Sequence, residues 1–340
     1  MRRERKSFTL VELLIVVAII AILISILLPV MIKIRRRAMV LVCPIAYVGE
    51  DAMIHICDPT GVRDLDVAKI GFHEGYRPYK GGFLTHQCAV WSPSGLKIAA
   101  NSWEPDKSVG NISHVVLIAE PSTGTIWRHR GPEWDGFCAW ADSTAFVTRG
   151  GLKPMYIADA QTGAVLDTPP YPDRELQNYS YTSFFTHVTT TADVGPYICG
   201  TMTEKGFDYY VMTLRKNLTP GKVIWKDTSE PYRVWGPPQI DPSGEWVAWT
   251  HFNWGSGAVG IALKQVKAPT SLPPRIITPG YLIVFCDWTE DGNMLVNISD
   301  VYPTWQLAIM NKNGELLRRL ATPVPVAQYS TATWRRYGHQ

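Results

Sequence analysis

The feature that most constrains this chain is an uncharged, apolar run near its N-terminus. From Leu13 to Ile32, 20 residues carry no formal charge, and only Ser25 and Pro29 interrupt the apolar pattern. As an α-helix rising about 1.5 Å per residue, the run spans the roughly 30 Å hydrocarbon core of a bilayer. It is too long for the apolar part of a secretory signal peptide, and no small-x-small cleavage site follows it. The segment therefore predicts a transmembrane helix.

Basic residues flank both ends of this run. Four lie within residues 2–6 and four within residues 33–37. The leader is expected to stay in the cytoplasm, because positively charged flanking segments are retained there. Since both flanks are basic, charge alone orients the helix only weakly.

A single carboxylate, Glu12, stands at the start of the apolar run. A charge at membrane depth is costly without a partner, so such residues are typically functional. The stretch Lys6-Ser7-Phe8-Thr9-Leu10-Val11-Glu12-Leu13-Leu14 resembles the N-terminus of type IV prepilins and pseudopilins. The resemblance implies that a prepilin peptidase cuts between Ser7 and Phe8 and that the new Phe8 amine is methylated. Glu12 would then neutralise that amine on a neighbouring subunit during assembly.

Two details modify the comparison with pilins. Pro29 stands where pilins place a helix-bending proline, and the family prefers glycine at the position of Ser7. Cys43-Pro44 follows soon after Arg37 and leaves little of the amphipathic second half of a pilin helix. The expected organisation is a leader over 1–7, a pilin-like transmembrane helix over 8–41 and a β domain over 42–340. An uncleaved signal anchor is the alternative.

The remaining composition is typical of an all-β domain with many turns. The chain holds 13 Trp, 15 Tyr, 25 Pro and 27 Gly, and no second long helical pattern accompanies them. The net charge is +3, and much of the positive excess lies in the two flanks of the apolar run. Nucleic acid is therefore not an expected partner.

The six cysteines allow a disulfide set, but their positions favour buried free thiols. Cys88, Cys138 and Cys286 each lie two or three residues before a tryptophan, at Trp91, Trp140 and Trp288. Equivalent positions in separate repeats are normally too far apart to form a disulfide. A small, buried, uncharged thiol fits such a position.

A repeat of 46 to 51 residues organises the domain. Its landmark positions are 91, 140, 191, 240, 288 and 334, separated by 49, 51, 49, 48 and 46 residues. Turns such as Ser92-Pro-Ser-Gly95 and Asp241-Pro-Ser-Gly244 follow the landmarks, and endings such as Asp159-Ala-Gln-Thr-Gly163 recur after the third strand. Four short strands in about 40–50 residues make one blade of a propeller.

The two ends of the repeat region complement one another. Residues 45–66 contain strands two and three of a blade without a first strand, and Ala332–Arg336 is a first strand without a blade. Joining them completes a sixth blade and closes the ring, which leaves no long free edge. The sequence predicts an all-β fold, a six-bladed β-propeller behind a single N-terminal transmembrane helix. The repeat resembles that of TolB-like propellers, whereas the alternatives, a β-sandwich or a jelly roll, lack this period.

One candidate ligand site follows from propeller geometry. First strands line the central channel, and two segments that enter them look alike, Phe83-Leu-Thr-His86 and Phe184-Phe-Thr-His187. With Gln239 and His339 they form a set that could bind a divalent metal through nitrogen and oxygen. The TolB-like resemblance extends to oligogalacturonate lyases, so a metal-dependent, carbohydrate-active enzyme is one alternative. Capping of strand ends by His and Thr is the preferred interpretation, and no catalytic residue is expected.

The tryptophans divide into two groups. Trp103, Trp134, Trp235 and Trp254 lie in predicted loops, where they could stack on sugars or dock a protein. Trp91, Trp140 and Trp288 occupy repeat-equivalent positions and are expected to pack between blades.

Together these patterns predict a pseudopilin-like protein of the bacterial inner membrane, with its domain on the periplasmic side or at the cell surface. Its expected partners are prepilin peptidase and other pilin or pseudopilin subunits of a type IV pilus or type II secretion pseudopilus. The propeller would bind a protein or glycan without a nucleotide or redox cofactor. A monomeric, membrane-anchored binding propeller is the second alternative.

Overall fold

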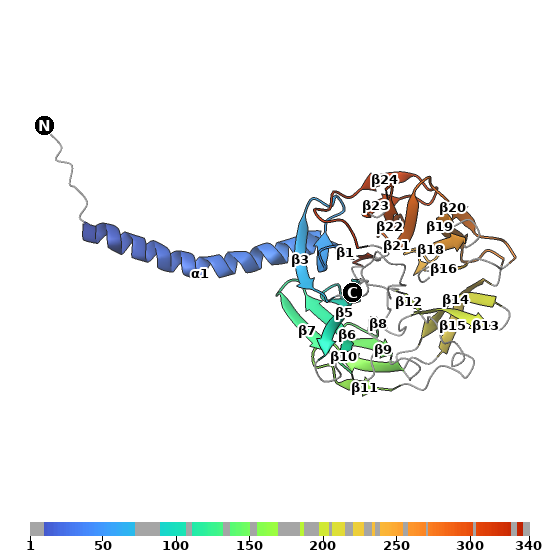
Figure 1. Ribbon diagram of the computed structural model, residues 1–340, viewed down its shortest axis with the longest axis horizontal. Helices are drawn as coiled ribbons and strands as arrows, with labels where there is room; N and C mark the ends of the chain where they lie inside the picture. The colour runs from blue at the N-terminus through green and yellow to red at the C-terminus, as the bar shows by residue number, and fades with distance from the viewer. Residues whose placement is uncertain are drawn as a thin grey trace.

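The chain is mostly β behind one N-terminal α-helix (Figure 1). The computed structural model describes residues 10–71, 89–106, 111–131, 137–149, 155–168, 184–186, 197–203, 206–214, 220–227, 233–234, 239–253, 258–269, 271–301, 304–327 and 332–335.

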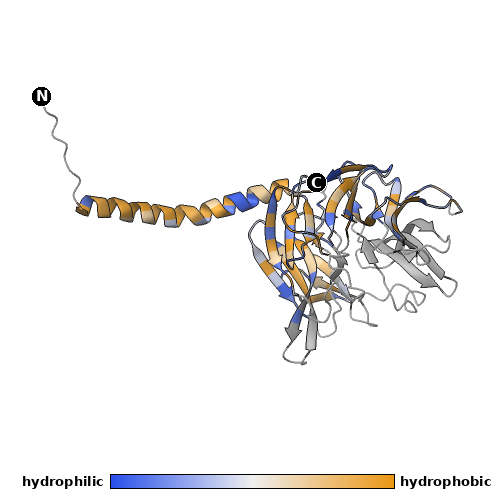
Figure 2. Cartoon of the chain, turned by 45° about the horizontal axis from the view of Figure 1, so that its top comes forward, coloured by the Kyte–Doolittle hydropathy of each residue, from blue (hydrophilic) through white to orange (hydrophobic). Residues whose placement is uncertain are grey.

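The helix α1 (Leu10–Val42) is 33 residues long and contains Pro29. Nearly all of its length is exposed, and Val40 is the residue that it buries. Within the described residues it is the one helix long and apolar enough to cross a membrane. Figure 2 shows the apolar stretch and, nearer to the sheets, the hydrophilic segment that contains residues 33–37. At about 1.5 Å per residue the helix is about 50 Å long, so it extends past a 30 Å bilayer core.

The described strands form six antiparallel sheets. In five of them, all the strands of a sheet are consecutive in the chain. The strands of these five sheets are β4 (Val90–Trp91), β5 (Ile98–Asp106), β6 (Asn111–Glu120) and β7 (Thr125–His129); β8 (Phe137–Trp140), β9 (Ala145–Arg149), β10 (Met155–Asp159) and β11 (Val165–Asp167); β12 (Phe184–Thr186), β13 (Tyr197–Thr203), β14 (Gly206–Leu214) and β15 (Pro220–Asp227); β16 (Arg233–Val234), β17 (Gln239–Ile240), β18 (Trp246–Asn253), β19 (Ala258–Gln265) and β20 (Arg275–Ile277); and β21 (Leu282–Trp288), β22 (Met294–Ser299), β23 (Gln306–Met310) and β24 (Leu316–Arg319).

The remaining sheet joins the two ends of the domain. Its order is β25 (Thr333–Trp334), β1 (Ile45–Val48), β2 (Met53–Cys57) and β3 (Asp64–Lys69). Ile45 lies opposite Trp334, and Ala46 lies opposite Thr333. The predicted pairing of the C-terminal strand with the N-terminal strands is thus confirmed.

The sheets follow one another around a ring, as in a β-propeller (Figure 1). Among the described residues, apolar cores lie between several pairs of neighbouring sheets. One core combines Ala46 and Ile54 with Trp91 and Leu117, and another combines Ile261 with residues of β21–β23. Helix α1 leaves the ring from its side, beside β1 and β3.

Burial on both faces explains the nearly continuous apolar composition of the inner strands. In β1, Ile45 and Tyr47 contribute to the core shared with the β21–β24 sheet. Ala46 and Val48 contribute to the core shared with the β4–β7 sheet. Successive side chains of a strand point to opposite faces, so a strand that lies between two cores needs apolar residues at every position.

The predicted turns form at the predicted places. In the turn after β4, the Gly95 amide donates to the Ser92 carbonyl at 2.8 Å, and Gly95 has φ 66°. In the turn after β10, the Gly163 amide donates to the Asp159 carbonyl at 2.9 Å, and Gly163 has φ 70°. Glycine suits both positions because it adopts positive φ without a Cβ clash.

The repeat-equivalent tryptophans pack between sheets, as predicted. The exposed fractions of Trp91, Trp140 and Trp288 are 2%, 2% and 0%. Trp140 Nε1 donates to the Val90 carbonyl, and Trp288 Nε1 donates to the Gln239 carbonyl, each at 2.9 Å. Each bond joins a first strand to the first strand of the preceding sheet. The indole N–H is thereby hydrogen-bonded while the rest of the ring fills the core.

The described cysteines are free and buried, namely Cys43, Cys57 and Cys286. The free thiol predicted at Cys286 is confirmed, and burial raises the pKa of that thiol to about 12. The Cys88 and Cys138 side chains lie outside the described residues.

A partly buried ion pair joins the turns of two neighbouring sheets. Lys312 Nζ lies 2.7 Å from Asp241 Oδ2 and 5.4 Å from the centroid of the Trp288 ring. Burial alone would raise the pKa of Asp241. The Lys312 ammonium, the Trp246 amide and the Ser243 hydroxyl outweigh burial and lower that pKa below its ordinary value.

We expect Lys312→Met to lower the free energy of unfolding by about 2 kcal/mol at pH 7, because it leaves a buried carboxylate without its cation. The pKa of Asp241 is lower in the folded chain than in the unfolded chain, where it is about 4. The ionised carboxylate therefore stabilises the fold above that pH, and this stabilisation is lost as the pH falls through the folded-state pKa. Urea unfolding between pH 3 and pH 7 should therefore show a shallower acid loss in the variant. Lys267→Met, at an exposed lysine, is the control. Equal losses in the two variants would contradict this role.

Candidate functional site: a buried histidine beside the helix joint

Most residues predicted to form a ligand rim or a processing site lie outside the described residues, and their roles stay predictions. They are Ser7, Phe8, His86, His187, His339, Trp134, Trp235 and Trp254. The loop predicted at Trp103 is wrong: the residue belongs to β5, because the β5–β6 hairpin extends past it and pairs its backbone with that of His114. The Trp103 side chain lies outside the described residues.

Two predicted residues are described. Glu12 lies in the exposed first turn of α1. Gln239 is buried in β17, and its Nε2 donates to the Cys286 carbonyl at 2.8 Å. Its own carbonyl accepts the Trp288 indole N–H. Gln239 therefore bonds to the neighbouring sheet through its side-chain Nε2 and through its backbone carbonyl. Its predicted role as a ligand stays a prediction.

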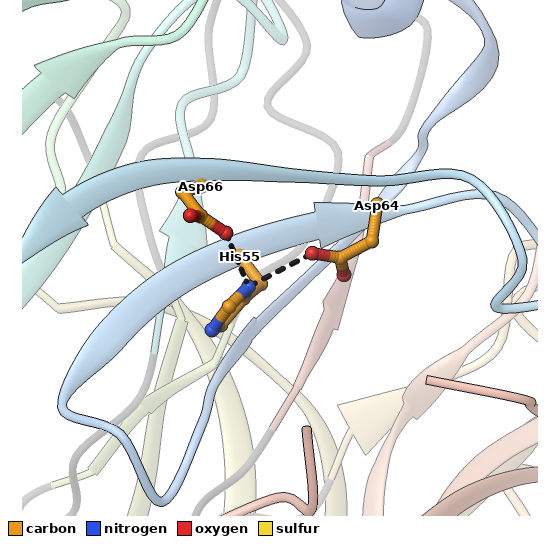
Figure 3. A group of neighbouring side chains, drawn as sticks. All are labelled: His55, Asp64 and Asp66. Atoms are coloured by element: carbon orange, nitrogen blue, oxygen red, sulfur yellow. Dashed lines mark hydrogen bonds and ion pairs between the residues drawn. The ribbon is translucent and has the colours of Figure 1, made fainter. Parts of the chain in front are cut away.

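A different polar cluster is well defined, and it lies in the sheet that joins the two chain ends. His55 on β2 lies opposite Tyr47 on β1 and opposite Asp66 on β3. Asp64 lies two residues before Asp66 and therefore shares its face of β3. Figure 3 shows both carboxylates directed at the imidazole from the outer strand. A register shift between Ile54 and His55 in the pairing with β3 marks a β-bulge beside the cluster.

Carboxylates face both nitrogens of the His55 ring. Nδ1 lies 2.9 Å from Asp64 Oδ1 and 3.2 Å from Asp66 Oδ1. Nε2 lies 3.1 Å from Asp51 Oδ1. The Tyr47 hydroxyl donates to Asp64 Oδ2 at 2.8 Å, and the Tyr47 and His55 rings stack with centroids 4.9 Å apart.

The turn between β1 and β2 brings Asp51 to the ring. The Ala52 amide donates to the Gly49 carbonyl at 3.1 Å, and Ala52 has φ 68°, a left-handed conformation that is unfavourable for alanine. A Cβ at Gly49 would lie 2.6 Å from Asp51 Oδ1 and 2.9 Å from His55 Nε2. A larger residue at position 49 would therefore displace the Asp51 carboxylate or the His55 ring, so the contact between this turn and the ring favours glycine.

The carboxylates set the charge of the ring. Burial lowers the pKa of His55, but its hydrogen bonds to Asp64 and Asp51 and their negative charges outweigh burial and raise it. Burial and the neighbouring Asp64 raise the pKa of Tyr47 far above its ordinary value, so Tyr47 stays a phenol and a donor. The side chain of His55 is 2% exposed, and that of Asp66 is 68% exposed.

This arrangement favours a proton over a metal ion at His55. His55, Asp64 and Asp66 place one potential ligand atom each within 4.8 Å of one another. A metal ligand needs a ring nitrogen with a free lone pair. Because both nitrogens face carboxylate oxygens at hydrogen-bond distance, both are best placed as N–H donors.

The same sheet and the neighbouring β4–β7 sheet hold the end of α1. Arg36 Nε donates to the Pro121 carbonyl at 2.6 Å, and Arg36 Nη2 approaches the Asp66 carbonyl at 3.4 Å. Arg335, which is 3% exposed, donates from Nη2 to the Leu41 carbonyl at 3.0 Å. A cation that binds a carbonyl in the last turn satisfies a group that the helix leaves unpaired. We call Arg36, Val40, Leu41 and Arg335 the helix joint.

Sequence reasoning missed this cluster. The available signal was the spacing of Asp64 and Asp66, two residues apart on a strand that follows a histidine-bearing apolar strand. Such a pattern places two carboxylates on one face but does not say which face meets the histidine.

Comparison with solved structures finds distant similarities. The chain is similar to dihydro-heme d1 dehydrogenase NirN in complex with DHE, with 12% identity over 87% of this chain and 75% of that one, at a TM-score of 0.46. It is also similar to the β-propeller domain of Cps50 (Swd1) from Myceliophteria thermophila, with 11% identity over 83% and 86% of the two chains, at a TM-score of 0.41. A third similarity is to hydrazine synthase from Kuenenia stuttgartiensis, with 13% identity over 71% and 68%, at a TM-score of 0.42.

No curated protein matches the chain in sequence. Its N-terminus, however, matches a family profile over residues 2–28, which include the apolar run and Glu12. The prepilin-type segment predicted from the sequence is thereby confirmed: residues 2–28 carry the prokaryotic N-terminal methylation motif.

Proposed function

We propose that this chain is a pseudopilin-like, membrane-anchored protein that presents a binding head. The observation that carries the proposal is the position of the methylation motif. It lies on a helix that is exposed over most of its length and is held by the domain at its C-terminal end. An exposed apolar helix needs a bilayer or neighbouring helices to cover it.

In this proposal the six sheets are the blades of a TolB-like propeller. The helix lies in the bacterial inner membrane, and the head lies on the periplasmic side or at the cell surface. Glu12 pairs with the Phe8 amine of a neighbouring subunit in a type IV pilus or a type II secretion pseudopilus. Prepilin peptidase and those subunits are the partners, and the head binds a protein or a glycan.

The N-terminus of the mature protein tests the proposal directly. In a host with a prepilin peptidase, mass spectrometry of the full chain should find a mature N-terminus at Phe8, methylated on its amine. Recovery of a chain that keeps residues 1–7 would contradict processing and leave an uncleaved anchor.

Assembly is tested separately by Glu12→Gln, which keeps the size of the side chain and removes its charge. We expect cleavage to be unchanged and co-isolation with other subunits to fall about tenfold or more, because the amine of the neighbour loses its counter-charge. Glu4→Gln, in the leader that cleavage removes, is the control. Assembly that survives Glu12→Gln unchanged would contradict the proposed role of Glu12.

A further inference from the structure

The His55 cluster and the helix joint share a residue, Asp66. Its carboxylate lies 3.2 Å from His55 Nδ1, and its carbonyl receives the Arg36 guanidinium of α1. Arg36 also binds the Pro121 carbonyl in the turn after β6. The helix end is therefore held between two sheets, and one of its two contacts through Arg36 depends on where β3 lies.

Strand β3 is one of the two outer strands of this sheet and pairs with β2 alone within it. Its pairing is interrupted by the register shift beside His55. The contacts of His55 with Asp64 and Asp66 add to the backbone hydrogen bonds between β2 and β3. Its contact with Asp51 holds the turn between β1 and β2. Breaking these contacts should loosen the first half of this edge strand, where Asp64 and Asp66 lie, before it affects Val67 and Ala68, which are buried in the core.

The contacts depend on a doubly protonated ring. A neutral imidazole has one N–H and one lone pair. The lone pair would face Asp51 on one side, or Asp64 and Asp66 on the other, at about 3 Å. That contact becomes repulsive, and a carboxylate loses its donor.

The titratable and charged groups around His55 come from each element packed against it. Their burial differs, since the side chain of Asp64 is 8% exposed and that of Asp51 is 38% exposed. They are Tyr47 on β1, Asp51 in the turn, and Asp64 and Asp66 on β3, with Arg36 of α1 bound to the Asp66 carbonyl.

We propose that protonation of His55 controls how firmly the helix joint holds the end of α1 against the β domain. With the imidazolium present, Asp51, Asp64 and Asp66 hold the turn and β3 against β2, and Arg36 binds the Asp66 carbonyl. When the proton is lost, β3 loosens and Arg36 loses its contact to the Asp66 carbonyl, while the contacts to Pro121 and Arg335 and the buried Val40 remain. The membrane helix is then less firmly oriented relative to the head. This inference rests on the joint and the cluster, and it holds whether or not the helix assembles with other subunits.

The direction of the pH dependence follows from the cluster. The pKa of His55 is raised in the folded chain, so its stabilising effect is complete below the unfolded value of about 6.5 and is lost as the pH rises through the folded value. The joint should therefore be firm in mildly acidic solution and looser at alkaline pH.

Hydrogen exchange of the full chain in detergent, measured between pH 6 and pH 9 and corrected for intrinsic rates, tests this pH dependence. Amides of β3 and of residues 36–42 should lose protection by about tenfold as the pH rises, in line with the loss of one charge-assisted hydrogen bond. His55→Gln should show low protection at every pH. Asp66→Asn, at an exposed side chain, should fold and show a reduced pH dependence. His129→Gln is the matched control, because His129 is a buried histidine whose Nε2 contacts a backbone carbonyl, Ala160 O.

Two outcomes would overturn the proposal. One is a pH profile in Asp66→Asn identical to that of the unmodified chain. The other is protection that follows added Mn²⁺ or its removal by EDTA at constant pH, since the cluster would then be a metal site.

Discussion

A chain that ends at residue 331, and so lacks β25, is expected to lose on the order of 5 kcal/mol of folding free energy. β25 supplies the backbone partner of β1. Thr333 Oγ1 donates to the Ala89 carbonyl at 2.6 Å, and Asp287 Oδ2 accepts the Trp334 amide at 2.8 Å. Arg335 also bonds to the Leu41 carbonyl of α1. Near-ultraviolet circular dichroism of the detergent-solubilised chain during urea unfolding measures the loss.

The control for this truncation is a chain that ends at residue 336 and so retains β25. Thr333→Val should cost about 1–3 kcal/mol, because it leaves the buried Ala89 carbonyl and the Trp91 amide without the hydroxyl. Unfolding of the chain ending at 331 at the same urea concentration as the chain ending at 336 would contradict a stabilising role for the pairing of β25 with β1.

Trp288→Ala is expected to lower the free energy of unfolding by about 3–5 kcal/mol, because it empties the space of a fully buried indole. The ring packs edge-on against Phe285 and lies beneath Lys312. Its Nε1 also supplies the hydrogen bond to the Gln239 carbonyl. The substitution therefore removes packing within one core and a bond between neighbouring first strands. Equilibrium unfolding in urea measures the loss.

A matched pair separates the hydrogen bond from the packing. Trp288→Phe and Trp91→Phe remove indoles that are equally buried. The Trp91 indole N–H has no partner among the described residues, whereas that of Trp288 donates to Gln239. Trp288→Phe should cost about 1 kcal/mol more than Trp91→Phe. Equal costs would mean that the indole bond between sheets does not contribute.

The turn chemistry made much of the β architecture predictable. The landmarks 91, 140, 240, 288 and 334 all lie in strands, and a positive-φ glycine is found at Gly95, Gly163 and Gly244. These features are local, because the torsion angles of a tight turn are set by the residues in it. The landmark at 191 lies outside the described residues.

The pairing of β25 with β1 was predictable for a different reason. Ile45 and its neighbours form a strand that begins a sheet without an inner partner, and the segment that contains Trp334 is a strand without a sheet. An unpaired strand is unfavourable, so two incomplete pieces in one chain indicate their own pairing. The observed register of Ile45 opposite Trp334 agrees.

The His55 cluster could not be predicted in the same way. Asp51, Asp64 and Asp66 are ordinary polar residues of a turn and an edge strand when considered locally. Their contact with one imidazole depends on the register of β2 with β3, on the bulge, and on the strained turn at Ala52. Each of these is a relation between segments, and a shift of one residue would turn the carboxylates to the other face.

By itself, the sequence determined the apolar helix with its methylation motif, the period of the strands and the pairing of the two ends. These follow from the length of an uncharged run and from the local preferences of glycine, proline and β-forming residues. Only the tertiary structure decided that Arg36 and Arg335 hold the end of the helix and that Asp66 links that joint to His55. The physical reason is distance along the chain: Arg335 binds a carbonyl 294 residues away, and a contact of that kind exists only after the ring has formed.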